Sequence, residues 1–448
     1  MNYREKLAVV APVNPGMSRE TDFYSPSYLQ LKRHLHQTLL DRIDLEQLQQ
    51  LSTEQFRREL SHLVERLIDD EKIMVNQTER RQLVIDIQHE MLGFGPLEPL
   101  FADPTVSDIL VNTHRRIYVE RYGKLALTPV TFDDDDHLLK VIEKIVSGVG
   151  RRIDESSPMV DARLPDGSRV NAIIPPIAMD GPMLSIRRFS VKPLTVDDLL
   201  ALHSLTPPIA SLLDALSKAK VNILISGGTG SGKTTLLNVL SGFIPADERI
   251  LTIEDAAELQ LQQPHVVRLE TRPPNIENKG EVSQRTLVKN ALRMRPDRII
   301  LGEVRGGEAL DMLQAMNTGH EGSFATIHAN TPRDALARLE NMVSMANANL
   351  EPRAVRQQIA SAITVVIQIT RLTDGSRKLV SLQEVTGMEG EIISMQEIFK
   401  FKRSGMTAEG KVLGHFCATG IHPHFDQRLR DYGVGVPEIN YDSGRVFA

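Results

Sequence analysis

The sequence predicts an α/β protein with more than one domain, and three observations carry that prediction. The chain has 448 residues, more than one hydrophobic core ordinarily organises, which favours two or three domains. The apolar run at 221–225 is followed by a glycine-rich loop and then by a helical pattern, as in a buried parallel sheet. Between 93 and 192 the pattern consists of short alternating runs separated by turn signals, which predicts a second, mixed α/β domain.

The residues before 93 divide into a leader and a helical bundle. Residues 1–25 combine several prolines with no apolar periodicity, so we expect a disordered leader. Residues 26–92 carry leucines at helical spacing, and Ser52 with Gln55 three residues later has the form of a capping box. We interpret the leucines as core packing, although a groove for a partner would give the same pattern.

The mixed domain at 93–192 is expected to contain strands joined by tight turns. Gly123 stands at the tip of one expected hairpin, and the stretch PDG at 165–167 marks a turn between two further alternating runs. Polar residues around Pro193 then begin the last domain, 193–448, which contains the glycine-rich loop.

Composition argues against several classes of function. The net charge is −6 and the pI about 6.1, so no global basic field favours nucleic acid or acidic lipid. Aromatic residues make up 4% of the chain and tryptophan is absent, which leaves few stacking platforms for single-stranded nucleic acid. The single cysteine, Cys417, permits neither an internal disulfide nor a four-cysteine metal site, in keeping with a reducing compartment. With no signal peptide and no apolar window of about 18 residues, we expect a cytoplasmic protein that reaches a membrane only through partners.

The stretch GGTGSGKTT matches the phosphate-binding pattern G-x-x-x-x-G-K-T without a mismatch. Its glycines allow main-chain N–H groups to turn toward phosphate oxygens at the positive end of a helix dipole. We expect Lys233 to reach the β- and γ-phosphates and the Thr234 hydroxyl to bind Mg²⁺. Because the chain lacks the N-K-x-D or T-K-x-D motif of GTPases, ATP is the expected nucleotide. The candidate nucleotide-binding residues of the loop are Gly227, Gly228, Thr229, Gly230, Ser231, Gly232, Lys233, Thr234 and Thr235.

Three further apolar strands are expected downstream of the loop, and each ends in polar side chains. The first ends at Glu254, with Glu258 a turn later, the second at Glu303 and the third at His328. Ligands of parallel α/β sheets bind at the carboxyl ends of the strands, so we expect these side chains to converge on the loop.

Each of these residues suits a role in phosphoryl transfer to water, which requires charge neutralisation and an oriented water molecule. Glu303 lies where a Walker B acid would hold Mg²⁺ through its water shell. Glu254 is the expected base that orients the attacking water, with Glu258 in reserve. Glu258 could equally be a solvated charge at a helix start, and His328 taken alone could be a satisfied structural histidine.

The segments GGTGSGKTT, ILTIEDAAEL, ALRMRPDRIILGEVRG and TGHEGSFATIHAN together resemble the Walker A, Asp box, Walker B and His box of the type II/type IV secretion ATPase superfamily. The resemblance extends from about residue 93 to about residue 433. The segments VDARLPDGSRVNAIIPP and GPMLSIRRFS are similar to the CpaF branch, the motor ATPases of tight-adherence (Flp, or type IVc) pili. The helical region before 90 also suits that branch.

This resemblance implies a homohexameric ring in which an N-terminal α/β domain of PAS-like type covers ATP bound to a RecA-like C-terminal domain. It also implies arginines donated across the cleft or between subunits, which would meet the γ-phosphate only when the domains close. Any one of them could instead form a surface ion pair worth little. His320 and His328 carry over as the His-box pair, which senses the γ-phosphate or links neighbouring subunits. The candidate arginines are Arg163, Arg169, Arg187 and Arg188, of which Arg169 and Arg188 are favoured, and Arg293 and Arg305 beside the Walker B strand.

Two features depart from the wider superfamily. Related ATPases of type II secretion and of other type IV pili often carry a four-cysteine zinc module, which one cysteine cannot build. Gly302 stands in the Walker B strand where many P-loop ATPases have aspartate, so Mg²⁺ would depend on Glu303 and the base must come from elsewhere. Both departures are normal for the CpaF branch, and the second favours Glu254 as the base.

The function we expect is a hexameric ATPase at the cytoplasmic face of the inner membrane. With inner-membrane platform proteins as partners, it would power extension of a tight-adherence pilus, and the sequence leaves open whether it also powers retraction. A type IV secretion traffic ATPase that moves protein or DNA is the alternative, and a nucleotide-gated scaffold with little turnover is a third. A nucleic-acid helicase fits less well, given the acidic balance and scarce aromatics, and we expect no nucleic-acid partner.

Overall fold

The computed structural model divides the chain into two compact units, residues 1–190 and residues 191–448. The leader predicted for 1–25 lies outside the described residues. The predicted helical bundle at 26–92 and most of the predicted domain after it fall together in the first unit, so their separation into two domains stays a prediction. The structure describes residues 26–42, 52–189, 193–272, 274, 279–346, 349–435 and 441–447.

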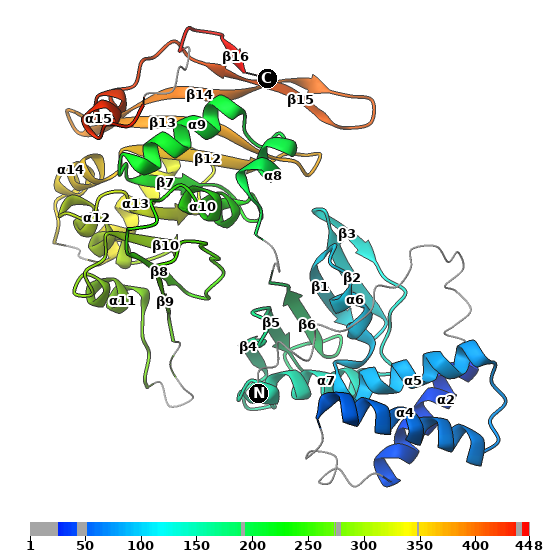
Figure 1. Ribbon diagram of the computed structural model, residues 1–448. Helices are drawn as coiled ribbons and strands as arrows, with labels where there is room; N and C mark the ends of the chain where they lie inside the picture. Colours follow the sequence, from blue (N-terminus) through cyan, green and yellow to red (C-terminus); the bar gives the residue numbers. More distant parts are fainter. Residues whose placement is uncertain are drawn as a thin grey trace. The chain divides into compact units, whose positions relative to one another are not determined.

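Helices form the amino-terminal part of the first unit (Figure 1). Ser52 and Asn76 each cap a helix: their side chains accept hydrogen bonds from the N–H groups of Gln55 and Glu79, whose side chains accept bonds in return. The capping box predicted at Ser52 is therefore confirmed. Apolar side chains from all three helices form one core. These helices are α2 (Pro26–Arg42), α4 (Thr53–Asp70) and α5 (Gln77–Leu92).

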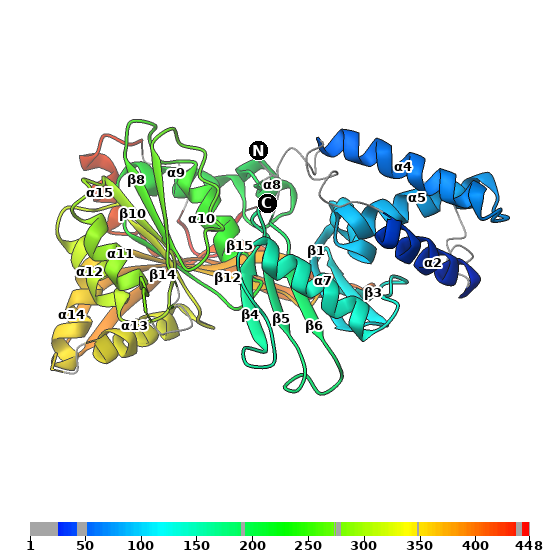
Figure 2. The ribbon, with the colours of Figure 1, turned by 90° about the horizontal axis from the view of Figure 1, so that it is seen from below.

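An antiparallel sheet and one long helix make up the rest of the first unit. Its elements are η1 (Gly95–Leu97), α6 (Glu98–Ala102), β1 (Val106–Thr113), β2 (Arg116–Arg121), β3 (Lys124–Leu127), α7 (Asp135–Gly148), β4 (Met159–Arg163), β5 (Arg169–Ile173) and β6 (Met183–Arg187). The strand order is β3-β2-β1-β6-β5-β4. Helix α7 lies across one face of this sheet (Figure 2). Leu138 and Ile142 of α7 belong to the same apolar core as Val170 and Ile186 of the sheet. The opposite face of the sheet is consequently the one that carries polar side chains.

A buried charge cluster joins the helices to the sheet. The carboxylate of Glu90, near the end of α5, accepts a 2.8 Å hydrogen bond from Lys32 Nζ of α2 and lies 3.0 Å from His137 Nε2 of α7. The side chains of Lys32 and Glu90 are only 9% and 5% exposed. Burial by itself would raise the pKa of Glu90, but the contacts with His137 and Lys32 outweigh it and lower the pKa to about 2. Glu90 thus anchors both α2 and α7 to α5.

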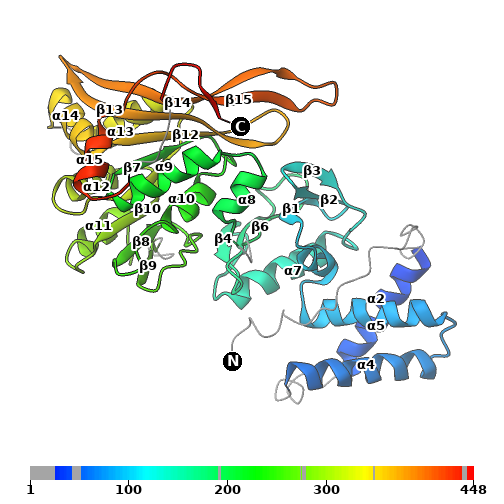
Figure 3. The same cartoon turned by 45° about the horizontal axis from the view of Figure 1, so that its top comes forward.

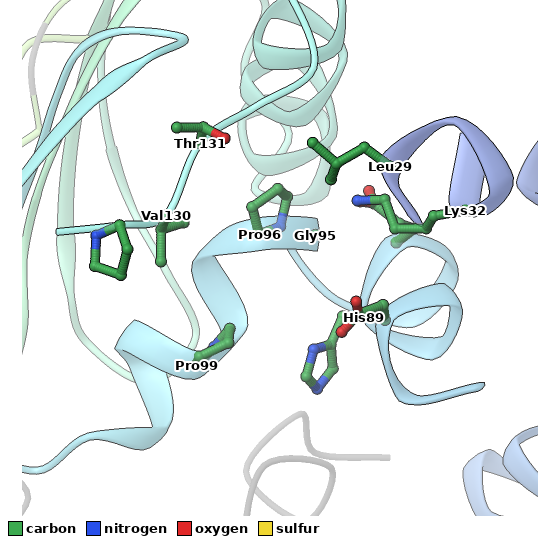
Figure 4. A pocket seen from close by; sticks show the side chains of 11 residues that line it. Leu29, Lys32, His89, Gly95, Pro96, Pro99, Val130 and Thr131 are labelled. Carbon is green, nitrogen blue, oxygen red and sulfur yellow. The ribbon is translucent and has the colours of Figure 1, made fainter. Parts of the chain in front are cut away.

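A small cavity lies beside this cluster (Figure 4). Lys32 and His89 line it from α2 and α5, while Pro96, Pro99 and Val130 line it from the segments that lead into and out of the sheet. None of its lining residues belongs to the glycine-rich loop, which is part of the other unit. We assign the cavity no role and regard it as a gap in the packing between helices and sheet.

A mixed sheet organises the second unit. Its strands are β7 (Ile223–Ser226), β8 (Ile250–Glu254), β9 (Val266–Glu270), β10 (Arg298–Val304), β11 (Phe324–Ile327), β12 (Val365–Arg371), β13 (Arg377–Glu389), β14 (Ile392–Met406), β15 (Val412–Ala418) and β16 (Val446–Phe447). The order in the 10-stranded sheet is β16-β15-β14-β13-β12-β7-β11-β10-β8-β9. The strands from β12 to β9 in that order pair in parallel. The long strands β13 and β14 continue the sheet as part of an antiparallel meander (Figure 3).

Helices cover both faces of this sheet. One apolar core holds α8, α9, α10 and α15 on one face, and a second core holds α11 to α14 on the other. Side chains of β7 alternate between them, since Ile223 and Ile225 enter the first core and Leu224 the second. The helices are α8 (Val196–Ala201), α9 (Pro207–Lys218), α10 (Lys233–Ser241), α11 (Gln284–Ala291), α12 (Glu308–Asn317), α13 (Pro332–Ala346), α14 (Pro352–Ala362) and α15 (Phe425–Asp431).

The predicted α/β class is confirmed. The apolar runs expected to form parallel strands occur as β7, β8, β10 and β11, and they are neighbours in the sheet. The predicted turns at Gly123 and Gly167 are present, and both glycines have positive φ. The meander of β13 to β16 is not predicted by the sequence patterns considered above. Among the helices of the described residues, none combines the length and the apolar character needed to span a membrane.

The buried cluster predicts a large loss of stability when Lys32 is neutralised. Lys32→Met should lower the free energy of unfolding of the first unit by about 3 kcal/mol, because the Glu90 carboxylate would remain buried with His137 as its remaining side-chain partner. Denaturant unfolding of the full chain, followed by hydrogen exchange in α2 and α5, measures this loss. Lys218→Met is the matched control, since its pair with Asp214 is 48% and 34% exposed and should contribute below about 0.5 kcal/mol. Equal losses in the two variants would contradict the prediction.

Candidate nucleotide-binding site

The glycine-rich loop between β7 and α10 has a conformation suited to a phosphate chain. Gly230 and Gly232 adopt φ angles of 67° and 100°, which other residues reach only with strain. A Cβ atom on Gly227 would lie 2.4 Å from the carbonyl oxygen of Ile369, so this position also requires glycine. In the described part of the chain no side chain caps α10, which begins at Lys233, so the N–H groups of its first turn can bind an anion. The residues present therefore fit a bound polyphosphate.

Lys233 lies against the carbonyl groups of the loop. Its Nζ donates 3.0 Å hydrogen bonds to the carbonyl oxygens of Gly227 and Gly228, and it lies 3.3 Å from Nε2 of His328. Burial lowers the pKa of Lys233, and the nearby charge of Glu303 opposes that shift. The loop itself thus holds the ammonium group in place.

Glu303 and His328 meet next to Lys233 because β10 and β11 run in parallel. Glu303 Oε1 lies 2.9 Å from His328 Nε2, and Oε2 accepts hydrogen bonds of 2.6 and 2.9 Å from Nη2 and Nε of Arg305. Arg305 Nη1 also donates a 3.1 Å bond to Asp255 Oδ2, just beyond the end of β8. Burial and then the charge of Lys233 lower the pKa of His328, which favours the neutral ring. Three strands thus contribute to one charged cluster beside the loop.

Glu254, the last residue of β8, is 3% exposed. Its Oε2 accepts hydrogen bonds of 2.7 and 2.9 Å from the N–H groups of Glu258 and Leu259, while Oε1 is buried without a hydrogen-bond partner among the described residues. Burial raises the pKa of Glu254 to about 7, although the two backbone bonds act in the opposite direction. A carboxyl group with this pKa can accept or release a proton near neutral pH, as a general base must.

Gly302 makes room for Glu254. Strands β8 and β10 are adjacent, and a Cβ atom on Gly302 would lie 2.8 Å from Cγ of Glu254, closer than real side chains approach. An aspartate at this position would therefore collide with the carboxyl-bearing side chain of the neighbouring strand. The departure from the usual Walker B pattern has a steric cause in this structure.

Thr234 and Glu303 supply oxygen atoms of the kind that Mg²⁺ binds. Thr234 is half-buried in the first turn of α10, directly after Lys233. In the residues that the structure describes, no group of three or more His, Cys, Asp or Glu side chains could hold a metal ion on its own. Bound Mg²⁺ would therefore depend on phosphate oxygens of the nucleotide as well as on these two residues, which is its usual mode in nucleotide sites.

His320 and Arg293 lie at the other edge of the parallel sheet. His320 precedes β11, whereas His328 follows it, and Arg293 is an exposed residue that precedes β10. The loop is at the carboxyl ends of the strands, so both residues lie at the edge away from the loop of the same unit. Nucleotide binding by His320 and Arg293 stays a prediction. A role of His320 in linking neighbouring subunits stays a prediction.

In the first unit, Arg163, Arg169 and Arg187 form a row across β4, β5 and β6. Arg169 lies directly opposite both other arginines, and side chains in directly opposite positions share one face of a sheet. This face is the one opposite α7, because the neighbouring residues Val170 and Ile186 enter the core. Arg187 Nε lies 3.2 Å from Asp108 Oδ1. The row concentrates positive charge on one face of the sheet.

Arg188 is not part of this row. Its guanidinium group donates hydrogen bonds to the carbonyl oxygens of Phe101 at 2.7 Å, Val106 at 3.2 Å and Leu100 at 3.5 Å, and to that of Asp103. Burial lowers its pKa. These bonds tie α6 to β1, and a contact of Arg188 with the γ-phosphate stays a prediction. Adjacent arginines in the sequence thus have different environments.

The sequence patterns do not single out Arg371 and Arg377, yet both lie beside the loop. Arg377 Nε donates a 3.0 Å hydrogen bond to the carbonyl oxygen of Gly230. Arg371 Nη1 lies 3.5 Å from the position that a Cβ atom on Gly230 would take. The turn signal TDGS between the two arginines could have indicated a hairpin, but nothing in the sequence brings that hairpin to the loop.

The family described as "Type II/IV secretion system protein" matches residues 90–414, more than half of the chain. The chain belongs to this family. A protein of Mycobacterium tuberculosis (strain H37Rv) that is named for conjugal transfer is 38% identical over 327 residues, which cover 71% of this chain and 92% of the relative. The conjugal transfer protein TrbB of Rhizobium radiobacter is 35% identical over 297 residues, which cover 64% of this chain and 85% of TrbB. Both alignments therefore cover most of the length of the relative.

A solved structure of a VirB11 ATPase, from the type IV secretion system of Brucella suis in complex with sulphate, is also similar to this family member. Its sequence is 29% identical, and the alignment covers 64% of this chain and 94% of the other. The TM-score of 0.36 is too low for that structure to support an argument about this one.

The raised pKa of Glu254 predicts that stability depends on pH. Its folded-state pKa is about 7 and its ordinary value 4.5, so the folded protein binds this proton more tightly than the unfolded chain does. The resulting stability is complete below pH 4.5 and is lost as the pH rises through 7. The glutamine side chain of Glu254→Gln does not titrate. The free energy of unfolding of this variant, relative to that of wild type, should therefore increase with pH. The total increase should be on the order of 3 kcal/mol. Calorimetry from about pH 5 to pH 8 measures this difference, with the exposed Glu391→Gln as control. A difference that does not change with pH would contradict the prediction.

The contact between Gly302 and Glu254 predicts a specific cost of adding one methyl group. Gly302→Ala should lower the free energy of unfolding by about 1–3 kcal/mol, because the new Cβ collides with Glu254 Cγ. Gly405→Ala is the control, since nothing lies within 4 Å of its Cβ position. Adding Glu254→Ala to Gly302→Ala removes the colliding atom, so the double variant should lose less than the sum of the single losses. Additive losses, measured by denaturant unfolding, would contradict the steric explanation.

Proposed function

We propose that this family member hydrolyses ATP and uses the reaction to move its two units. The main evidence for this proposal is the cluster of side chains at the carboxyl edge of the parallel sheet. There a phosphate-type loop with Lys233 adjoins the Glu303–His328 pair, and the buried Glu254, with its pKa about 7, ends the strand next to that of Glu303. A loop that only bound phosphate would not need a proton acceptor of this kind on the neighbouring strand.

In this proposal each side chain has a separate task. The N–H groups of the loop and the ammonium group of Lys233 bind the phosphates, and Thr234 and Glu303 hold Mg²⁺ together with phosphate oxygens. When bound, Mg²⁺ neutralises negative charge on the phosphoryl group being transferred. Glu254 accepts the proton of the attacking water. His328, between Lys233 and Glu303, transmits the loss of the γ-phosphate to both.

Glu254 suits the task of general base better than the other two carboxylates. Both oxygens of Glu303 already contact Arg305 or His328. Glu258 is half-buried and contributes its backbone N–H to Glu254. Oε1 of Glu254, in contrast, is buried without a hydrogen-bond partner in the described residues, and a water molecule would satisfy it.

The coupling to motion is proposed to depend on the arginine row of the first unit. We propose that Arg169, with Arg163 and Arg187 beside it, meets the γ-phosphate of ATP in the same or a neighbouring subunit of a homohexamer. Hydrolysis and phosphate release remove the negative charge that attracts the row, so the units separate. We also propose that the chain is divided into a leader (1–25), a helical bundle (26–92), an α/β domain (93–192) and a RecA-like domain (193–448).

The machine served by this motor is proposed to be a tight-adherence pilus, as in the CpaF branch. The similarity of VDARLPDGSRVNAIIPP and GPMLSIRRFS to that branch supports this client, and so do α2, α4 and α5, which lie almost entirely before the family match begins at residue 90. The partners would be inner-membrane platform proteins, and the location would be the cytoplasmic face of the inner membrane.

A type IV secretion client that moves protein or DNA is the second candidate. The specific observation in its favour is that the relatives from Mycobacterium tuberculosis and Rhizobium radiobacter carry names that refer to conjugal transfer. The same ATP-driven motion would serve either client, so the choice depends on surfaces outside the nucleotide site.

Two substitutions test the enzyme and separate binding from chemistry. Lys233→Ala should abolish ATP binding and phosphate release, because the ammonium group that the loop holds is lost. Glu254→Gln should retain ATP binding and lower kcat by about 100-fold or more, because the proton acceptor is removed. Calorimetric binding and a phosphate-release assay on the purified chain measure both effects. Wild-type turnover no greater than that of Glu254→Gln would instead indicate a scaffold with little turnover.

The client is tested in cells that carry Lys233→Ala at the native locus. Electron microscopy should show that surface pili are lost, while conjugal DNA transfer and protein secretion continue at wild-type rates. Normal piliation together with loss of DNA transfer or secretion would overturn the pilus proposal in favour of the second candidate.

A further inference from the structure

The β12–β13 hairpin packs directly against the glycine-rich loop. Strand β12 pairs in parallel with β7, with Gln368 opposite Ser226, so the carboxyl end of β12 lies beside the start of the loop. The next residue of β12 is Ile369. Its carbonyl oxygen lies 2.4 Å from the position that a Cβ atom on Gly227 would take, and its Cδ1 lies 3.6 Å from the corresponding position on Gly232. Loop and hairpin are therefore one packed structure within the second unit.

Arg377 contacts the part of the loop in which two glycines have positive φ. Its Nε donates a 3.0 Å hydrogen bond to the carbonyl oxygen of Gly230, a residue that lies 147 positions away in the sequence and has a φ of 67°. Its Cδ lies 3.2 Å from the Cβ position of Gly232, whose φ is 100°. A charged donor strengthens such a hydrogen bond, so Arg377 stabilises the left-handed main-chain conformation of the loop at Gly230.

Arg371 brings a second guanidinium group to the same residue of the loop. It lies directly opposite Arg377 in the β12–β13 pairing, and its Nη1 is 3.5 Å from the Cβ position of Gly230. Like charges in directly opposite positions destabilise a strand pair. Unfavourable local arrangements such as this pair of opposite arginines occur most often at functional sites. Whatever else the two arginines contact, they raise the positive potential at Gly230.

We infer that Arg371 and Arg377 complete the nucleotide site from the side of the β12–β13 hairpin. Arg377 is a positioning residue that holds Gly230, and Arg371 contacts the polyphosphate of the nucleotide. The inference rests on the proposed function of the loop. Lys233 contacts Gly227 and Gly228 instead, so the two arginines serve a different part of the loop.

The contribution of the two arginines is to binding rather than to the chemical step. The backbone N–H groups of loops of this type cradle the α- and β-phosphates, which ATP and ADP share. The groups suited to proton transfer and to Mg²⁺ are on β8, β10 and α10, not on the hairpin. Loss of either arginine should therefore weaken ATP and ADP equally.

The test compares Arg371→Gln, Arg377→Gln and Arg377→Lys with Arg403→Gln in the full chain. Arg403 is an exposed arginine of β14 whose Nη2 lies 3.4 Å from Thr373 Oγ1 in the same hairpin, so it controls for a change of charge nearby. Calorimetry measures the affinity for ADP and for a non-hydrolysable ATP analogue, and steady-state assays measure KM and kcat. A thermal melt without nucleotide reports whether each variant is folded.

The two glutamine variants should weaken both nucleotides by about tenfold or more and raise KM in parallel, with kcat within about twofold of wild type. Arg377→Lys should recover part of the affinity, and Arg403→Gln should match wild type. Unchanged affinities in Arg371→Gln, or a fall in kcat with unchanged ADP affinity, would overturn the inference. So would a lowered melting temperature of Arg377→Gln that Arg377→Lys restores without restoring affinity. If wild type binds no nucleotide, the proposed function fails instead.

Discussion

Parallel pairing of β7, β11, β10 and β8 is the constraint on which the candidate site depends. The four short strands are buried and run in one direction, so each delivers the residue at its carboxyl end to the same edge of the sheet. That edge receives the glycine-rich loop, Glu254, Glu303 and His328 from widely separated parts of the sequence. Antiparallel pairing of any of these strands would send its polar end to the opposite edge, where His320 and Arg293 lie.

Space at that edge is limited, and glycines mark where neighbouring chains come close. Gly302 accommodates the side chain of Glu254, and Gly227 accommodates the carbonyl group of Ile369. The same crowding that excludes an aspartate from position 302 also buries Glu254 and raises its pKa to about 7. Close packing of β8 against β10 therefore accounts both for the glycine at position 302 of the Walker B strand and for the raised pKa of Glu254, the proposed base.

The arginines of the two units have different surroundings. Arg188 is surrounded by carbonyl oxygens and ties α6 to β1. Arg163, Arg169 and Arg187 stand in a row on one face of a sheet, and Arg371 and Arg377 face each other across a strand pair. Like charges at such short range repel, so an anion that binds between them is stabilised by several cations at once.

The sequence by itself determined the α/β class, the parallel strands, the phosphate-type loop and the polar strand ends, because apolar runs and turn residues act over a few neighbouring positions. It also led to Glu254 as the candidate base, although the burial that raises its pKa is visible only in the structure. Tertiary structure alone decided that Arg188 donates hydrogen bonds to carbonyl oxygens of α6 and β1, that His320 lies away from the loop and that Arg371 and Arg377 lie beside it. These outcomes depend on contacts between residues far apart in the chain, such as Arg377 with Gly230, and no local pattern encodes which distant backbone a side chain will meet.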